Sequence, residues 1–323
     1  MIAKTLHIEE LVLESGTTLT DVPVLYHQRG ACDGSKPIVW TFHALTANSN
    51  PEEWWVGLFS GDGMYADWDV ICVNMLGSPY GSGSPLTHGG MSFPLVTIRD
   101  TAKAQLAVAA ALNIQHIDTL LGGSCGGYQA LEFAYAFSGS VGHMVLLATG
   151  AREMPWNKAI HEAMRLTLKT DPTLNERDGR RGLQAARAIG MLNYRTAAQF
   201  NDAQPDDSEA LEDFKAPSYM RYHGQKLVDR FDAACYYKLT EQLDTHHMGR
   251  GRGGLQSALG KITVPTLVIG ISSDVLIPVA VQEELATNLP NATLKVVDSA
   301  YGHDGFLIEY PQINAAIAAF YHE

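Results

Sequence analysis

Cysteine is scarce in this chain of 323 residues. The four cysteines stand far apart, without the C-x-x-C spacing of zinc-binding and redox motifs, at Cys32, Cys72, Cys125 and Cys235. So few cysteines in so long a chain exclude a scaffold built on disulfides and a cysteine-rich zinc site. We therefore expect free thiols and no bound metal.

Long apolar runs are also lacking. Residues 1–16 carry charges throughout, without the apolar stretch of a signal peptide, and no later run is long enough to span a bilayer. Basic residues are fewer than acidic ones: the chain has 23 Lys and Arg and 35 Asp and Glu, which gives a net charge of −12. Such an acidic chain has no positive surface for nucleic acid or anionic lipid. We expect a cytoplasmic protein with small-molecule substrates that binds neither nucleic acid nor membrane.

What the chain does have is the composition of a globular protein, with 46% hydrophobic and 18% charged residues. In the first 150 residues, short apolar runs alternate with turns rich in Gly, Ser, Pro and Asn and with a helical pattern at 98–112. The expected strands are 9–13, 22–26, 37–42, 69–73, 116–121 and 143–148. Alternating strands and helices indicate a mostly parallel sheet, and the hairpin-like early strands indicate an antiparallel edge.

The pattern changes after residue 150, where charge and methionine increase and β-branched runs become rare. Helical periodicity predicts helices at 156–169, 182–193 and 225–243, whereas strands return at 266–271 and 293–297 before a closing helix at 312–321. A sheet interrupted by a helical block is typical of an α/β-hydrolase fold with flanking helices and a helical cap. We predict a core of 1–150 and 261–323, and a cap (lid) insertion at 151–260.

A glycine-rich turn within residues 118–133 gives the clearest chemical signal. An apolar run, the sequence Gly-Gly-Ser-Cys-Gly-Gly and a helical pattern follow one another there, which is the strand–turn–helix context of a nucleophile elbow. Either Ser124 or Cys125 can occupy the apex. The second and third positions after the apex pack most tightly; Ser124 at the apex puts glycine at both, whereas Cys125 puts Tyr128 at one of them. We favour Ser124 as the nucleophile.

Two later residues complete a catalytic triad in the order that this fold uses. Asp274 directly follows a buried-strand pattern, and His303 lies in a glycine-flanked loop after the next strand. Both stand at carboxyl ends of strands, where the sites of parallel sheets collect. We expect the backbone N–H groups of Leu45 and Cys125 to form the oxyanion hole, and we interpret the neighbouring His43 as a structural histidine rather than a base.

Several segments, spread from about residue 10 to the C-terminus, together resemble one family. They are 43–46 (HALT), 74–77 (NMLG), 93–100 (FPLVTIRD), 122–132 (GGSCGGYQALE), 224–232 (GQKLVDRFD), 272–274 (SSD) and 301–304 (YGHD). The chain resembles the homoserine O-acetyltransferase family of the α/β-hydrolase superfamily. The resemblance implies ping-pong transfer of an acetyl group from acetyl-CoA, through an acyl-enzyme on Ser124, to L-homoserine in methionine synthesis. It also implies that no cofactor is permanently bound, that acetyl-CoA is a co-substrate, and that the helical cap forms a homodimer.

The resemblance further implies a site for the amino acid. Arg187 and Tyr194 fall on the family's Arg and Tyr seven residues apart in the first cap helices, and Asp304 falls on the residue after the catalytic histidine. A guanidinium suits the carboxylate of an amino acid, and a carboxylate suits its ammonium. The chain departs from the family in a shorter segment between 81 and 93, and in Cys125 and Gly305, where Met or Leu and Ala are usual.

Three functions stay open. Transfer to homoserine is favoured, because a simple alkyl ester has no use for two charged clamps. An esterase of the same family would use the same triad on small acyl esters, and a complete triad argues against a silent binding protein. Some relatives use serine or succinyl-CoA, so the acceptor and the donor are open as well.

No P-loop or Rossmann motif marks a site for CoA. Arg177, Arg180 and Arg181 are candidates for its phosphates, although such a cluster is commonly a solvated helix end. His246 and His247 lack partners at metal-ligand spacing, and we expect them at the surface or in the cap.

Overall fold

The structure is a computed structural model, and it describes residues 1–176, 178–206, 209 and 211–322. Within these residues, eight strands form one sheet in the order β1-β2-β4-β3-β5-β6-β7-β8. The strands are β1 (Ile2–Val12), β2 (Thr18–Arg29), β3 (Ile38–Phe42), β4 (Asp69–Val73), β5 (His116–Gly123), β6 (Ser140–Leu147), β7 (Thr266–Ile271) and β8 (Ala292–Val297). This is the α/β-hydrolase arrangement that the sequence predicted.

The sheet is parallel except at one edge. β1 pairs with β2 and β2 with β4 in antiparallel register, and all other neighbours pair in parallel. Every residue of β3, β4 and β7 is buried, as expected for central strands covered on both faces, whereas most of β1 is exposed. The predicted antiparallel edge is confirmed, with a first strand longer than expected.

Helices cover both faces of the sheet. On one face lie α3 (Ile98–Ala111), α4 (Cys125–Ala136), α10 (Leu255–Leu259) and α11 (Val279–Asn288), which contribute to one apolar cluster with the strands. On the other face lie the short helices α1 (Pro51–Trp54) and α2 (Val56–Phe59) together with α12 (Tyr310–Tyr321). Among the described residues, no helix is both long and apolar enough to cross a lipid bilayer.

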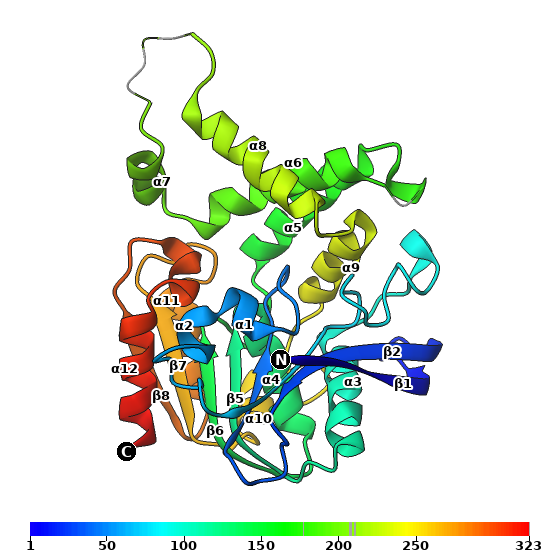
Figure 1. Cartoon of the computed structure of the whole chain (residues 1–323), viewed down its shortest axis with the longest axis vertical. Coiled ribbons are helices and arrows are strands. Elements are labelled where there is room, and N and C mark those ends of the chain that lie inside the picture. Colours follow the sequence, from blue (N-terminus) through cyan, green and yellow to red (C-terminus); the bar gives the residue numbers. More distant parts are fainter. Residues whose placement is uncertain (177, 207–208, 210, 323) are drawn as a thin grey trace.

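A separate group of helices stands above the carboxyl ends of the strands (Figure 1). It consists of α5 (Pro155–Lys169), α6 (Arg180–Tyr194), α7 (Ala197–Ala203), α8 (Lys215–Val228) and α9 (Ala233–Asp244). The apolar faces of α5, α6, α8 and α9 share one buried cluster, which also includes Cys125 and Tyr128 from the start of α4. The helical layer therefore packs directly over the predicted nucleophile elbow.

The boundaries within this layer differ from the prediction in one respect. The predicted helix at 225–243 is wrong, because the chain turns at 229–232 and two helices meet there. Asp232 accepts a hydrogen bond from the Cys235 amide at 2.8 Å and caps the start of α9. Helix α10 lies near the end of the range predicted for the cap. It buries Ala258 and Leu259 in the apolar cluster that contains residues of the sheet, and not in the cluster shared by the cap helices.

Candidate active site

Ser124 stands on a strained turn between β5 and α4. Its φ of 55° and ψ of −128° lie in a region that residues with a side chain avoid. The glycines around it allow this geometry: a Cβ at Gly122 would overlap the backbone of Gly126, and one at Gly126 would overlap the carbonyl of Phe42. Strand and helix can therefore approach closely enough to hold the serine side chain above the sheet.

The two candidate nucleophiles have different surroundings. Ser124 Oγ lies 2.8 Å from His303 Nε2. Cys125 is 3% exposed and its Sγ lies 3.8 Å from the carbonyl oxygen of His43. Burial, together with the nearby Glu153 carboxyl, raises the pKa of the Cys125 thiol. The structure thus places Ser124 beside the histidine and leaves Cys125 buried and uncharged, in agreement with the favoured alignment.

His303 and Asp274 meet at the same edge of the sheet. His303 lies in a 3-10 helix, η3 (Gly302–Leu307), and its Nδ1 donates to Asp274 Oδ2 at 2.7 Å. The other oxygen of Asp274 accepts the amides of Leu276 and Ile277 at 2.9 Å each. With Nδ1 protonated, Nε2 can accept the proton of the Ser124 hydroxyl. Asp274 and His303 follow Ser124 by 150 and 179 positions in the sequence. The fold brings all three predicted residues into one hydrogen-bonded chain.

Charge around the ring sets the basicity of His303. Burial lowers the pKa of the ring, but the Asp274 carboxylate opposes burial by charge and hydrogen bond, with smaller contributions from Asp304 and Glu153. The net pKa is raised above the ordinary value of histidine. A general base with a raised pKa is a stronger proton acceptor, but a higher pH is needed to keep it in its unprotonated, active form.

The loop after β3 approaches the same point. Leu45 and Cys125 both line a cavity with Ser124, and no hydrogen bond among the described residues uses either backbone amide as donor. His43 holds this loop: its Nδ1 donates to the Ala44 carbonyl at 2.8 Å, and its Nε2 accepts the Met75 amide at 2.9 Å. Complete burial lowers the pKa of His43 to about 4. The prediction that His43 is structural is confirmed.

The predicted amino-acid ligands lie on one side of Ser124. Arg187, Tyr194 and Asp304 line a cavity of about 100 Å³ together with Ser124 and His303. The Arg187 guanidinium stands 5.4 Å from the centre of the Tyr194 ring, within the range of a cation–π contact. All the residues that the resemblance implied are therefore brought together.

The sequence analysis missed Arg195 in this region. Its Nε donates to Asp304 Oδ2 at 2.7 Å, and this ion pair ties the end of α6 to the loop of His303. The partners are 109 positions apart. The only local signal was an arginine next to Tyr194.

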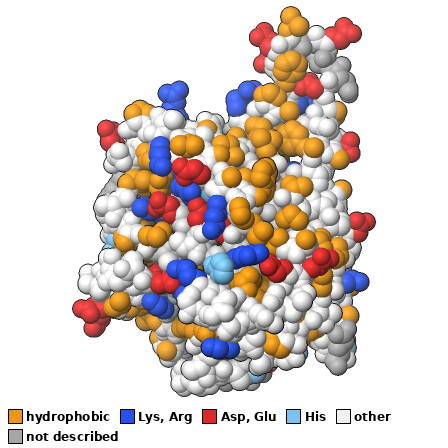
Figure 2. Space-filling model, turned by 180° about the vertical axis from the view of Figure 1, so that it is seen from behind, with side chains coloured by type: hydrophobic (Ala, Val, Ile, Leu, Met, Phe, Trp, Pro, Cys, Tyr) orange, Lys and Arg blue, Asp and Glu red, His pale blue; other side chains and the backbone are white. Residues whose placement is uncertain are grey.

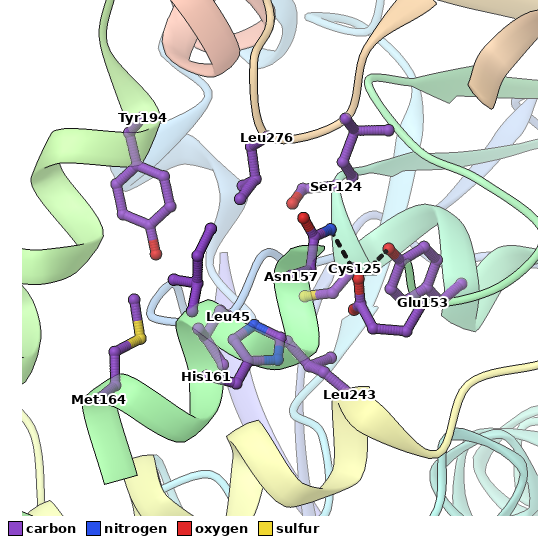
Figure 3. A pocket seen from close by; sticks show the side chains of 13 residues that line it. Leu45, Ser124, Cys125, Glu153, Asn157, His161, Met164, Tyr194, Leu243 and Leu276 are labelled. Carbon is purple, nitrogen blue, oxygen red and sulfur yellow. Dashed lines mark hydrogen bonds between the residues drawn. The ribbon is translucent and has the colours of Figure 1, made fainter. Parts of the chain in front are cut away.

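A second cavity, of about 40 Å³, opens on another side of Ser124 (Figure 3). Three polar residues in its wall, Glu153, Asn157 and His161, were also missed. Glu153 accepts from Asn157 Nδ2 at 2.6 Å, and His161 Nδ1 lies 2.7 Å from Asp244 Oδ1. The available signal was the spacing of four residues between Asn157 and His161, which puts both on one face of α5; Glu153 lies two residues before that helix.

Other predicted positions lie elsewhere. His246 is 2% exposed and its ring stacks on Tyr128 with centroids 4.1 Å apart, so it is not a surface residue. Arg177 lies outside the described residues. Arg180 approaches Asp229 at 3.4 Å, and neither Arg180 nor Arg181 lines either cavity beside Ser124. Among the described residues, no group of three or more His, Cys, Asp or Glu could hold a metal ion.

Known proteins share this architecture and much of the sequence. The family model for the alpha/beta hydrolase fold matches residues 25–310. The homoserine O-acetyltransferase of Cyclobacterium marinum is 36% identical, covering 98% of this chain and 93% of that protein. That of Salinibacter ruber is 39% identical, covering 98% and 97%.

Solved structures extend the comparison. The crystal structure of homoserine O-acetyltransferase from Staphylococcus aureus has a TM-score of 0.85 and 27% identity, covering 99% of this chain and 94% of that one. The crystal structure of esterase E22 has a TM-score of 0.89 at 20% identity, covering 99% of both chains. At that identity the likeness shows the fold alone.

The geometry predicts that Ser124, and not Cys125, is the reactive nucleophile. Ser124→Ala should abolish labelling by a fluorophosphonate probe and lower kcat on an acetate ester by a factor on the order of 10⁶. Cys125→Ala should still be labelled, because the Cys125 thiol is buried and contacts the His43 carbonyl, whereas Ser124 contacts His303. Mass spectrometry of the labelled peptide checks both variants, and a probe that stays on Ser124→Ala but is lost from Cys125→Ala would show the opposite assignment.

The raised pKa of His303 predicts a pH dependence. Activity should fall on the acid side as His303 becomes protonated, with the limb of kcat/KM above the ordinary histidine range. Asp274→Asn removes the charge that raises this pKa, so the limb should move to lower pH while kcat drops about 10⁴-fold. Asp298→Asn, an exposed carboxylate at the end of the neighbouring strand, is the control and should change neither. An acid limb that stays in place in Asp274→Asn would contradict the account.

Proposed function

We propose a specific reaction for this chain, which belongs to the homoserine O-acetyltransferase family of α/β-hydrolase enzymes. It transfers an acetyl group from acetyl-CoA, through an acyl-enzyme on Ser124, to the hydroxyl of L-homoserine. The reaction is ping-pong, with CoA leaving before homoserine reacts. The names of the full-length relatives support the acceptor and the acetyl group, and the geometry around Ser124 supports the covalent step.

The first half-reaction uses the Ser124–His303–Asp274 chain. His303 Nε2 takes the hydroxyl proton as Ser124 Oγ attacks the thioester carbonyl. The negative charge that develops on the carbonyl oxygen is met by the amides of Leu45 and Cys125, the latter at the positive end of α4. The carbon–sulfur bond then breaks, the proton passes from His303 to the CoA sulfur, and the acetyl group remains on Ser124.

The second half-reaction reverses the proton path. The hydroxyl of homoserine takes the place of the departed thiol, His303 removes its proton, and its oxygen attacks the acetyl carbonyl. When the tetrahedral intermediate collapses, the proton returns to Ser124 and the acetylated amino acid leaves. Asp274 keeps the ring in one orientation, with Nδ1 protonated throughout, because its other oxygen is anchored by two amides.

One observation carries the choice of acceptor: Arg187, Tyr194 and Asp304 share a cavity with Ser124 and His303. In the proposed complex, Arg187 binds the carboxylate of the amino acid and Asp304 its ammonium, and the side-chain hydroxyl reaches Ser124. Two charged groups in a small cavity under a helical cap give an amino acid an advantage over water as the acceptor.

The second candidate is an esterase of the same family, in which water takes the acyl group. The ion pair between Arg195 and Asp304 favours it, because the carboxylate that would bind an ammonium already has a cation at 2.7 Å. Esterase E22 shows that this fold serves that reaction in another protein. The two candidates share the first half-reaction and differ only in the acceptor.

Two further parts of the proposal concern partners. We propose no permanently bound cofactor, with acetyl-CoA as a co-substrate; Arg180 and Arg181 are candidates for its phosphates. We also propose a homodimer formed through the cap. Figure 2 shows apolar side chains along the projecting end of the molecule, and exposed large apolar residues of the cap include Leu192, Leu211, Phe214 and Tyr222.

The proposal predicts that CoA release from acetyl-CoA depends on homoserine. Arg187→Gln should raise the KM for homoserine about 10²-fold, because a charged hydrogen bond to the carboxylate is lost, and should leave hydrolysis of p-nitrophenyl acetate unchanged. Arg221→Gln, an exposed arginine on α8, is the matched control. The measurement follows free thiol and p-nitrophenol. Ester hydrolysis without any effect of homoserine on CoA release would establish the esterase instead.

A further inference from the structure

Two cavities meet at Ser124. Both are lined by Ser124, Leu45 and Tyr194, which places the nucleophile and one oxyanion amide at their junction. The first contains the groups assigned above to the amino acid, Arg187 and Asp304. A tetrahedral intermediate on Ser124 needs room for two substituents, the acyl chain and the leaving or attacking group. The second cavity is thus available for the acyl chain.

The second cavity presents hydrogen-bond acceptors. Glu153 is 5% exposed, and its Oε1 accepts Asn157 Nδ2 at 2.6 Å and the Met154 amide at 3.2 Å. Asn157 is 3% exposed, and its Oδ1 is buried without a hydrogen-bond partner. His161 Nδ1 lies 2.7 Å from Asp244 Oδ1. Asp244 is itself neutralised by Arg165 at 2.7 Å.

The cavity is also small and otherwise apolar. Its volume is about 40 Å³, well below the roughly 150 Å³ of a cavity that admits benzene. Met164 from α5 and Leu276 from the loop after β7 form walls (Figure 3), and Ile160 from α5 also lines the cavity. No Lys or Arg is among the residues that line it. Such a space suits a two-carbon group and offers no Lys or Arg to pair with a longer, negatively charged acyl group.

We propose that this cavity is the acyl pocket, and that Glu153 and the apolar walls restrict it to short uncharged acyl groups such as acetyl, excluding dicarboxylic groups such as succinyl. The inference rests on the acyl-enzyme of the proposed function and names the class of acyl group that it carries. It does not depend on the identity of the acceptor.

The physical reason is the cost of an unpaired charge. A carboxylate at the far end of an acyl chain would leave water and meet the Glu153 carboxyl and the free oxygen of Asn157, with no Lys or Arg in the lining to pair with it. Burial already raises the pKa of Glu153, which shows how poorly this space supports one negative charge. A second charge there is less favourable still.

A panel of p-nitrophenyl esters tests the pocket without CoA or homoserine. In each case Ser124 Oγ bonds to the acyl carbon, His303 takes the proton, p-nitrophenolate leaves, and water later frees the acyl group. For the wild-type enzyme, kcat/KM for the acetate should exceed that for the hemisuccinate by about 10³-fold or more. The acetate should exceed the butyrate by about tenfold or more, because the walls leave no room for two further methylenes.

Two variants separate charge from size. Glu153→Gln keeps the volume and an acceptor for Asn157 but removes the carboxylate, so the ratio of acetate to hemisuccinate turnover should fall about tenfold. Met164→Ala enlarges the cavity, so the ratio of acetate to butyrate turnover should fall about tenfold while hemisuccinate stays excluded. Glu283→Gln, an exposed carboxylate on α11, is the control and should leave both ratios unchanged.

The outcomes are distinct. Hemisuccinate turned over as fast as acetate by the wild-type enzyme would overturn the proposal, and an unchanged ratio in a folded Glu153→Gln variant would remove Glu153 from it. If Glu153→Gln does not fold, the wild-type panel and Met164→Ala still decide whether this cavity holds the acyl group and excludes charged or longer ones. An enzyme that shows the predicted acyl selectivity but whose CoA release ignores homoserine would refute the proposed acceptor while retaining the acyl pocket.

Discussion

The close approach of α4 to the ends of β3 and β5 is the constraint on which the site depends. Side chains at Gly122 or Gly126 would overlap backbone atoms, so glycine lets the helix begin directly after the strand. Ser124 is then held at a φ of 55° directly before α4, with its hydroxyl 2.8 Å from His303 Nε2. A strained backbone of this kind persists because the packing on both sides permits no other path.

The remaining groups gather around that point from the ends of neighbouring strands. β7 leads to Asp274 and β8 to His303, and both side chains are buried and bonded to each other. The cap then divides the space over Ser124 into two. One cavity carries Arg187 and Asp304, which we propose bind the amino acid, while the other carries Glu153 and Asn157, which we propose exclude an acyl group with a second carboxylate. In this account, the same fold that generates the acyl-enzyme selects its acyl group on one side and its acceptor on the other.

Features encoded in local sequence were predictable. The nucleophile elbow was predictable, because its glycines are needed wherever a strand and a helix pack closely around a nucleophile. The strand ends that carry Asp274 and His303 were predictable as well. The helix break at 229–232 was not, because the apolar periodicity runs through it and only Asp232, a capping residue, marks the new start.

Groups that depend on distant packing were not predictable. Asn157 and His161 share a face of α5, and Glu153 lies two residues before that helix, but whether this face meets solvent or a cavity is decided by Tyr128 and Leu276 from other parts of the chain. Arg195 finds Asp304 only because α6 ends beside η3. The burial of His246 likewise depends on its stacking against Tyr128, a residue of α4 that is distant in the sequence.

The most direct test of the account is a rapid-quench experiment with acetyl-CoA and the wild-type enzyme, followed by mass spectrometry of the peptide that contains Ser124. The account predicts that an acetyl group appears on Ser124 as CoA is released, and that added homoserine removes it faster than water does, with the acetyl group recovered on the homoserine oxygen. An acetyl group on another residue, or a Ser124 adduct whose decay homoserine does not accelerate, would contradict it.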